Sequence, residues 1–280
     1  MARLGPALRR WNRRRIARKR DAWGRNEIAT RSVAGTPHDW DTPLVVSLTS
    51  YPPRFSTLAL TLQCLIQQTV TPDRVVLWIA HDDLEALPPE VLALKAQGLE
   101  ISGCEDTRSY KKIIPALAAF PEATIVTADD DVHYAADWLS GILTQAAAPE
   151  VTVGAVRALD LGRLPDGGVA PYADWQHLES GPKRGTTVFP TGVCGVLYRP
   201  CCFDAEVHDM ARAQELCPSA DDIWLYWMHR LAGGESLAFG KRKSIVNWDT
   251  GGPDLHAINV LGGQNDVQIA QMVARYGAPF

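Results

Sequence analysis

Residues 124–131 read Thr-Ile-Val-Thr-Ala-Asp-Asp-Asp, a short apolar run that ends in three adjacent carboxylates. A short run rich in β-branched residues predicts a buried strand. The same pattern, an apolar run followed by polar residues, occurs three times upstream, at 44–48, 75–79 and 99–101. Stretches with helical spacing lie between these runs. We therefore expect an α/β fold with a doubly wound, mostly parallel sheet and helices on both of its faces.

Polar clusters follow all four predicted strands, at 49–54, 81–83, 105–112 and 129–131. In a doubly wound sheet the ligand-binding crevice lies beyond the carboxyl ends of the strands. The four clusters are therefore predicted to converge on one site.

The alternation weakens after residue 153, and three parts of the chain can be distinguished. Residues 1–40 form a basic arm, residues 41–160 the regular half, and residues 161–280 a less regular second half. Within the second half, residues 160–185 are rich in Gly, Pro and Asp and are expected to form a long loop. A helix is predicted from Ile223 to Leu231.

Composition and charge exclude several classes of protein. The chain has 280 residues, 46% of them hydrophobic and 21% charged, which excludes wholesale disorder and a small disulfide scaffold. Residues 1–25 hold 10 of the 28 Lys and Arg but 1 of the 32 Asp and Glu. The remaining body is acidic, which argues against binding of nucleic acid. The arm is either a solvated tail or a basic amphipathic helix on anionic lipid.

The cysteines and the N-terminus bear on location. None of the six cysteines forms a C-x-x-C pair, so a zinc site has little support. The basic start lacks the apolar stretch of a secretory signal. We expect a cytoplasmic protein that binds peripherally to the inner face of the membrane through residues 1–25.

The carboxylates Asp129, Asp130 and Asp131 repel one another unless a cation offsets them. Alternate residues of an extended run point the same way, so Asp129 and Asp131 can share one Mg²⁺ or Mn²⁺. A solvated, helix-capping loop is the alternative. His256 is either a third metal ligand from a C-terminal loop or an ordinary structural histidine.

Two other charged pairs are candidates. Asp221 and Asp222 open the predicted helix, where one of them can act as a general base. Alternatively, Ser219 and Asp222 form a capping box. Lys111, with Lys112, can meet a pyrophosphate or can lie in a solvated loop.

From about Leu44 to Trp248, the chain resembles bacterial glycosyltransferases of the GT-A fold that build surface polysaccharides. The likeness rests on four elements in order: residues 45–52, the D-x-D-like run 127–131, the glycine-bearing segment 190–198 and the acidic pair in 220–225. The second strand departs from the family, because His81-Asp82-Asp83-Leu84 stands where relatives often have D-D-G-S-x-D.

The resemblance implies a nucleotide-sugar donor, with UDP favoured, and a divalent metal held mainly by Asp131. Thr49, Tyr51 and Arg54, with Asp82 or Asp83, would hold the nucleoside. Residues 41–160 would then bind the donor, with Asp129 and Asp130 contributing to its site. Residues 161–280 would bind a glycan or lipid-linked acceptor and carry the catalytic base. By analogy with the family's acidic pair, Asp222 is the favoured base of an inverting transfer.

Two other functions remain open at this point. One is a nucleotidyltransferase acting on a sugar phosphate, although residues 49–54 lack the glycines that such an enzyme normally has. The other is a non-catalytic sugar-binding protein of the same fold, for which three unpaired aspartates would be a needless electrostatic cost.

Overall fold

The structure is a computed structural model that describes residues 6–240, 246–248, 259 and 262–280; of residues 6–14, 17 and 18 it describes the backbone only. Within these residues, no helix combines the length and apolar character needed to cross a membrane.

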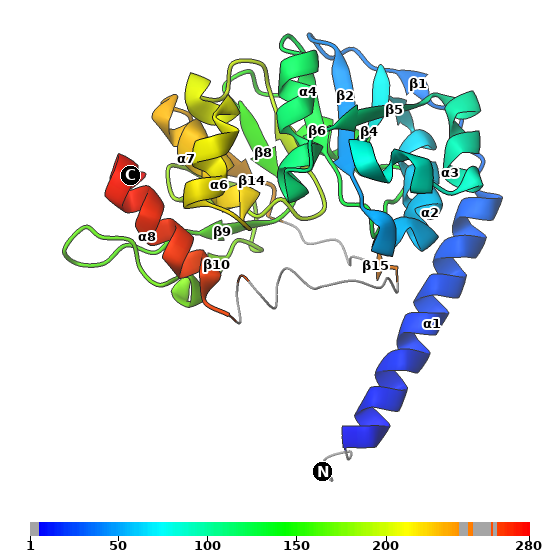
Figure 1. Cartoon of the computed structure of the whole chain (residues 1–280), viewed down its shortest axis with the longest axis horizontal. Helices are drawn as coiled ribbons and strands as arrows, with labels where there is room; N and C mark the ends of the chain where they lie inside the picture. The colour runs from blue at the N-terminus through cyan, green and yellow to red at the C-terminus, as the bar shows by residue number, and fades with distance from the viewer. Residues whose placement is uncertain (1–5, 241–245, 249–258, 260–261) are drawn as a thin grey trace.

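An eight-stranded sheet forms the centre, in the order β5-β4-β2-β6-β13-β8-β14-β11 (Figure 1). Its strands are β2 (Leu44–Thr49), β4 (Arg74–Ala80), β5 (Leu99–Cys104), β6 (Thr124–Thr127), β8 (Val153–Ala155), β11 (Lys183–Gly185), β13 (Val196–Tyr198) and β14 (Ser236–Ala238). Strands β5, β4, β2 and β6 pair in parallel, as do β8 and β14. Strands β13 and β11 run against their neighbours. The sheet is mostly parallel, as the sequence predicted.

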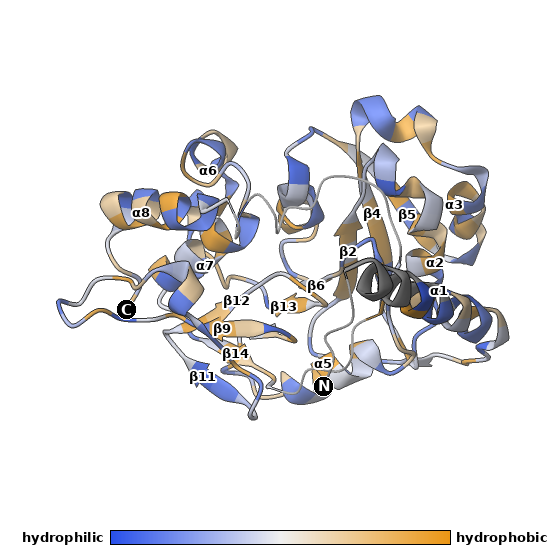
Figure 2. Ribbon diagram, turned by 90° about the horizontal axis from the view of Figure 1, so that it is seen from below, coloured by the Kyte–Doolittle hydropathy of each residue, from blue (hydrophilic) through white to orange (hydrophobic). Residues whose placement is uncertain are grey.

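Helices cover both faces of this sheet, because its strands are apolar on both sides. Val45 of β2 belongs to one buried cluster, and its neighbours Leu44 and Val46 belong to the other. The first face packs against α4 (Ile114–Ala119), α6 (Met210–Leu216), α7 (Asp221–Leu231) and α8 (Gln264–Tyr276). The second packs against α2 (Phe55–Ile66), α3 (Pro89–Ala93) and α5 (Trp138–Gln145). In Figure 2, β2 and β4 are hydrophobic along their length. The doubly wound α/β fold is confirmed.

Three smaller sheets complete the described part of the chain. They pair β1 (Thr36–Pro37) with β3 (Val70–Thr71), β9 (Ala158–Asp160) with β10 (Gln176–His177) and β12 (Val188–Pro190), and β7 (Val132–His133) with β15 (Val246–Asn247). The expectation of one long loop at 160–185 is therefore wrong, since β10 and β11 lie inside it. These strands are too short for a periodic signal in the sequence.

Helix α1 (Pro6–Thr30) projects from the body at its N-terminal end and docks at its C-terminal end (Figure 1). Ile28 is 5% exposed within the second buried cluster. Arg31, just beyond the helix, donates hydrogen bonds to the carbonyls of Cys64, Gln67 and Tyr134 at 3.3, 3.2 and 2.8 Å. The expectation that the arm is a solvated tail or a helix on lipid is thus wrong for its last residues, because Ile28 and Arg31 pack against α2 and its C-terminal end.

The docked end of α1 touches the strand that follows the three aspartates. Glu27 Oε2 lies 2.8 Å from His133 Nε2, and Trp23 lies against the same imidazole with 4.9 Å between ring centroids. Gly24 faces Trp248 so closely that a Cβ atom there would lie 2.7 Å from the indole. A glycine is therefore needed where α1 crosses this tryptophan.

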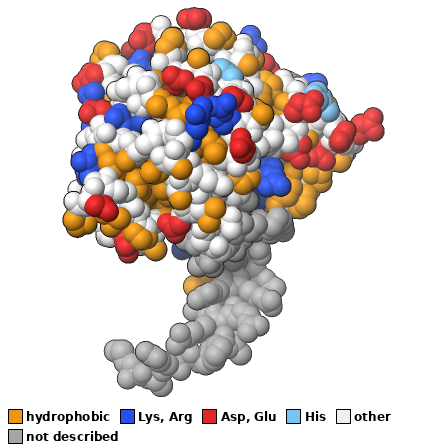
Figure 3. Space-filling view, turned by 60° about the vertical axis from the view of Figure 1, so that its left-hand side comes forward, with side chains coloured by type: hydrophobic (Ala, Val, Ile, Leu, Met, Phe, Trp, Pro, Cys, Tyr) orange, Lys and Arg blue, Asp and Glu red, His pale blue; other side chains and the backbone are white. Residues whose placement is uncertain are grey.

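The body has mixed surface charge. On the face shown in Figure 3, acidic and basic side chains are interspersed with apolar ones. The segment with the strongest excess of one sign is the sequence of residues 1–25.

Candidate active site at the carboxyl ends of the strands

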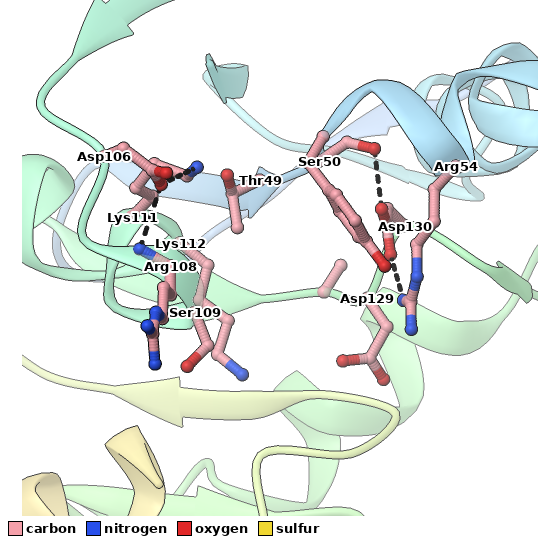
Figure 4. Close-up of a pocket in the computed structure, with 12 residues that line it drawn as sticks. Thr49, Ser50, Arg54, Asp106, Arg108, Ser109, Lys111, Lys112, Asp129 and Asp130 are labelled. Carbon is pink, nitrogen blue, oxygen red and sulfur yellow. Dashed lines mark hydrogen bonds and ion pairs between the residues drawn. The ribbon is translucent and has the colours of Figure 1, made fainter. Parts of the chain in front are cut away.

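A cavity of about 450 Å³ lies beyond the carboxyl ends of β2 and β6. Three of the four predicted polar clusters line it, at 49–54, 106–112 and 128–130. Figure 4 shows the basic side chains of the 3-10 helix η4 (Arg108–Lys112) on one side and Asp129, Asp130 and Arg54 on the other. Asp82, which the resemblance placed at the nucleoside, is exposed in the turn after β4 and is not among the lining residues.

The predicted nucleoside residues differ in how free their side chains are. Thr49 Oγ1 donates to the carbonyl of Trp78 at 2.8 Å, so its hydroxyl is engaged within the sheet. Tyr51 has its ring 5.6 Å from the Arg54 guanidinium and lines the cavity. Tyr51 is therefore the better placed of the two to contact a base.

Asp130 has a structural role. Its Oδ2 accepts from Ser50 Oγ at 2.6 Å, and its Oδ1 accepts from Arg54 at 2.7 Å. The carboxylate is 5% exposed, and both oxygens have partners in the protein. It holds Arg54 at the cavity wall.

Asp129 points into the cavity from the end of β6 (Figure 4). Its Oδ2 accepts the Cys194 N–H at 2.8 Å, and its own N–H donates to Tyr134 Oη at 2.8 Å. Cys194 has φ 67°, a conformation that costs energy for a residue other than glycine and is typical of functional sites. Burial raises the pKa of Asp129, although Lys112 and the Cys194 N–H act to lower it.

Asp131 lies at the edge of the same group. Its Oδ2 is 3.2 Å from the Arg54 guanidinium, and its carbonyl accepts from the Trp248 N–H at 2.8 Å. Burial raises its pKa to about 6; Arg54 acts to lower it, and the charges on Asp129 and Asp130 raise it further. Keeping this carboxyl ionised in the folded protein costs free energy, and a bound cation would remove that cost.

The two lysines of η4 have different surroundings. Lys111 Nζ lies 2.5 Å from Asp106 Oδ1, while Lys112 Nζ lies 3.2 Å from Asp221 Oδ2. Burial acts to lower the pKa of Lys112, but the charges of Asp221 and Asp129 outweigh it and raise that pKa. Lys112 therefore carries its charge among the carboxylates, whereas the predicted Lys111 lies farther along the cavity wall.

Two local features place Lys112. Ser47 Oγ of β2 donates to the Lys112 carbonyl at 2.6 Å, which fixes η4 against the sheet. Gly192 has φ 54°, and a Cβ atom there would lie 3.1 Å from Lys112 Nζ. The glycine of the 190–198 segment thus leaves room for the ammonium group.

A second cavity of about 500 Å³ adjoins the first, and the two share Arg54, Ser109, Lys112 and Asp129. Most of its other walls come from the second half of the chain, while Asp131 and Arg157 come from residues 41–160. These walls include Asp131, Arg157, Tyr172, Thr191, Asp221, Asp222 and Asn265. The acidic strand end therefore separates a cavity with cationic walls from a cavity with a second acidic pair.

Asp221 and Asp222 begin α7 inside the second cavity. The capping box between Ser219 and Asp222 is not formed, because the Ser219 N–H donates to Gln268 Oε1 at 3.0 Å. Asp222 Oδ1 instead accepts from the N–H of Ile223 at 3.0 Å. Burial, reinforced by the charge of Asp221, raises the pKa of Asp222. Its carboxylate has the raised affinity for protons that a general base needs.

Two carboxylates of the second cavity are candidate ligands for a metal. Among the residues that the structure describes, no three His, Cys, Asp or Glu side chains form a metal cage. Asp129 and Asp131 both line the second cavity, and Mg²⁺ commonly uses one or two carboxylates with substrate phosphates. His256, the predicted third ligand, lies outside the described residues.

Several site residues were not singled out from the sequence. They are Ser50, Cys194, Arg157, Tyr172 and Asn265. Their place depends on contacts between distant segments, and none belongs to a local motif. Of these residues, only Arg157 has a signal in the sequence, because it is the one charged residue in the otherwise uncharged run from residue 151 to 159.

A scan against protein-family models finds no match for this chain, and a search of curated proteins finds none either. Solved structures to which it is similar include a mannosyltransferase from Pyrobaculum calidifontis in complex with GDP-Man and Mn²⁺ (16% identity, 54% of this chain, 45% of that chain, TM-score 0.34). They also include S. aureus TarS in complex with UDP (13% identity, 72% of this chain, 59% of that chain, TM-score 0.47). A third is 4-diphosphocytidyl-2C-methyl-D-erythritol synthase (12% identity, 81% of this chain, 100% of that chain, TM-score 0.47).

This chain spans less than two thirds of the length of the first two structures, at 45% and 59%. At identities of 12–16% and TM-scores of 0.34–0.47, these likenesses do not say which reaction this chain catalyses. The first carries the name of a glycosyltransferase, the class that the sequence resembles.

Proposed function

We propose that this protein is a metal-dependent glycosyltransferase that moves a sugar from a nucleotide-sugar donor to a hydroxyl of a glycan or glycolipid acceptor. One observation carries the proposal. The acidic end of β6 lies between two adjoining cavities, one with cationic walls and one that contains the acidic start of α7. A transfer between two substrates needs two such compartments that meet at the reacting atoms.

The first cavity fits the donor. Arg108, Ser109 and Lys111 offer cations and a hydroxyl for the diphosphate, and Tyr51 offers an aromatic face for the base. We expect UDP to be the nucleotide. On this basis residues 41–160 supply the donor site, and residues 161–280 supply most of the acceptor site and the base.

Asp129 and Asp131 fit a divalent ion, because both are half-buried carboxylates on the second cavity whose pKa values are raised mainly by the loss of solvent. When bound there, Mn²⁺ or Mg²⁺ would neutralise the diphosphate and stabilise it as it leaves. Arg54 forms ion pairs with Asp130 and Asp131, so it keeps these two carboxylates in place beside Asp129.

Asp222 is the proposed base. An acceptor hydroxyl in the second cavity must lose its proton as it attacks the anomeric carbon, and Asp222 lines that cavity with a raised proton affinity. Lys112 pairs with Asp221 and so leaves Asp222 as the member of the pair without a lysine contact. A single displacement of this kind inverts the anomeric configuration.

The N-terminal end of α1 has a separate proposed role. It projects from the body, and the sequence of residues 1–25 is strongly basic (Figure 1). Each Lys or Arg near an anionic leaflet contributes about 1 kcal/mol of attraction, which suffices for peripheral binding. We propose that this segment holds the enzyme at an anionic membrane surface, on the cytoplasmic side, where a lipid-linked acceptor would lie.

The test is a screen of nucleotide sugars for thermal stabilisation in Mn²⁺ and in EDTA, followed by transfer assays on Asp222→Asn. We expect stabilisation in Mn²⁺ alone. We also expect the variant to bind donor normally and to lose at least about a hundredfold in transfer, the usual minimum for loss of a general base.

Asp166→Asn is the matched control, because Asp166 lies in an exposed turn away from both cavities. Release of pyrophosphate from a nucleoside triphosphate and a sugar phosphate would favour the nucleotidyltransferase instead. Nucleotide affinity that is equal in EDTA and Mn²⁺ would contradict the metal dependence.

A further inference from the structure

Arg157 is a half-buried cation without a carboxylate partner on the wall of the second cavity. It lies between β8 and β9, and its carbonyl accepts from the N–H of Thr191 at 3.1 Å. Its Nε atom is buried and makes no hydrogen bond. No carboxylate among the described residues lies within ion-pair distance of its guanidinium. A buried donor left unpaired costs about 1–3 kcal/mol, so a ligand is expected to supply its partner.

The other cations of this cavity are already used. Arg54 pairs with Asp130 and Asp131, and Lys112 pairs with Asp221. Of the lysines and arginines that line the cavity within the described chain, Arg157 alone has no carboxylate. Its charge is therefore available to a group that enters from solvent.

Two further polar groups line the same cavity. Asn265, near the start of α8, is 6% exposed, and its Oδ1 is buried without a hydrogen bond. Tyr172 also lines the cavity, and the charges of both Asp222 and Arg157 act on its hydroxyl. The Tyr172 hydroxyl thus lies within electrostatic reach of the proposed base and of Arg157.

The acidity of the cavity does not exclude an anion at Arg157. Asp221 and Asp131 face Lys112 and Arg54, and the acidic members of the cavity lie at the ends of β6 and α7. Arg157 instead stands with Thr191 and Tyr172, which carry hydroxyl groups. An acceptor that spans the cavity would place its reacting hydroxyl at Asp222 and an anionic group at Arg157.

We propose that Arg157 binds an anionic group of the acceptor, a phosphate ester or a carboxylate, while the unpaired Asn265 Oδ1 accepts from one of its hydroxyls. The acceptor is then a charged sugar or polyol derivative. This inference deepens the proposed function and rests on it, because only that function makes the ligand an acceptor. The anion site itself can be measured without any reaction.

The experiment measures binding of small probes to the full-length protein by calorimetry. The probes are glycerol 3-phosphate and glucuronate, with glycerol and glucose as their neutral counterparts. Wild-type protein should bind at least one anionic probe more tightly than its counterpart, and the better probe identifies phosphate or carboxylate. Arg157→Gln should weaken that binding at least about tenfold, because a charge-assisted hydrogen bond is lost.

Two matched variants locate the effect. Arg74→Gln removes an equal charge from an exposed pair with Glu100 and should change nothing. Arg108→Gln removes a cation from the first cavity and should leave anion binding intact. Equal probe binding by wild type and Arg157→Gln, or its loss in Arg108→Gln, would overturn the inference. So would an absence of preference for the anionic probes.

UDP affinity in Mn²⁺, measured on the same samples, separates this inference from the proposed function. Unchanged UDP affinity in Arg157→Gln is expected. If Arg157→Gln loses UDP instead of the small probes, Arg157 belongs to the donor and the inference is wrong. If wild type binds no nucleotide yet shows the Arg157-dependent anion site, the proposed function fails and the anion site stands.

Discussion

Replacing Asp131 by Asn should stabilise the metal-free protein at pH 8. The side chain is only 18% exposed, and the pKa of its carboxyl in the folded state is raised to about 6 from an ordinary value of 3.8. The folded state therefore holds this proton more tightly than the unfolded state does. Stability contributed by the protonated group is complete below about pH 4 and is lost as the pH rises to about 6. Above pH 6 the ionised carboxylate is a net cost.

The size of the cost follows from the two pKa values. A difference of one in pKa corresponds to about 1.4 kcal/mol, so a difference of about two corresponds to ~3 kcal/mol at pH 8. This value already includes the attraction of Arg54, because that attraction acts on the same pKa. Asn has almost the same shape and cannot ionise. For a chain of this size, ~3 kcal/mol would raise Tm by about 6 °C or more.

The assay is thermal and urea unfolding of wild type and Asp131→Asn at pH 4, 6 and 8 in EDTA. The difference should be near zero at pH 4 and should grow to its full value at pH 8. In saturating Mn²⁺ the order should reverse, because the wild type alone gains a bound ion. If Asp131→Asn is less stable than wild type at pH 8 in EDTA, the electrostatic account of this site is refuted.

Two further predictions concern the docked end of α1. Deleting residues 1–20 should abolish sedimentation with anionic vesicles and leave Tm almost unchanged. Deleting residues 1–35 should also lower Tm by several degrees, because Ile28 and Arg31 are lost. Equal Tm values for the two truncations would contradict this. Gly24→Ala should destabilise the protein by about 1–3 kcal/mol in urea, since its Cβ would overlap Trp248. Gly141→Ala is the control: its Cβ would lie in open space on α5, and it should stabilise the protein by about 0.5–1 kcal/mol. A Gly24→Ala variant as stable as wild type would show that α1 can shift.

The parallel half of the sheet could be predicted because each of its strands is a continuous apolar run. Helix starts were less predictable. Helix α2 begins at Phe55 with no side chain that caps it, so no local capping signal marks its start. Tyr134 lies before the start of α5 at Trp138, and its hydroxyl accepts the N–H of Asp129.

The site could be predicted in part for the same reason. Tyr51, Arg54 and Asp129 follow predicted strands and do line the cavities. Asp82 follows one too, yet its side chain faces solvent. Arg157 and Asn265 come from segments 108 residues apart in the chain, as their numbers show, and no local rule brings them together.

The hydrogen bonds of Trp248 have a consequence for the order in which the molecule can be built. Its N–H holds the carbonyl of Asp131, and its indole donates to Thr61, 187 residues earlier in the chain. Helix α1 also docks on this tryptophan. During synthesis the parallel core of β2, β4, β5 and β6 can therefore form early, but the turn of Asp131 and the surface against which α1 packs stay incomplete until Trp248 has emerged. Contacts of such long range are slow to close, so completion of the site should be the last step of folding.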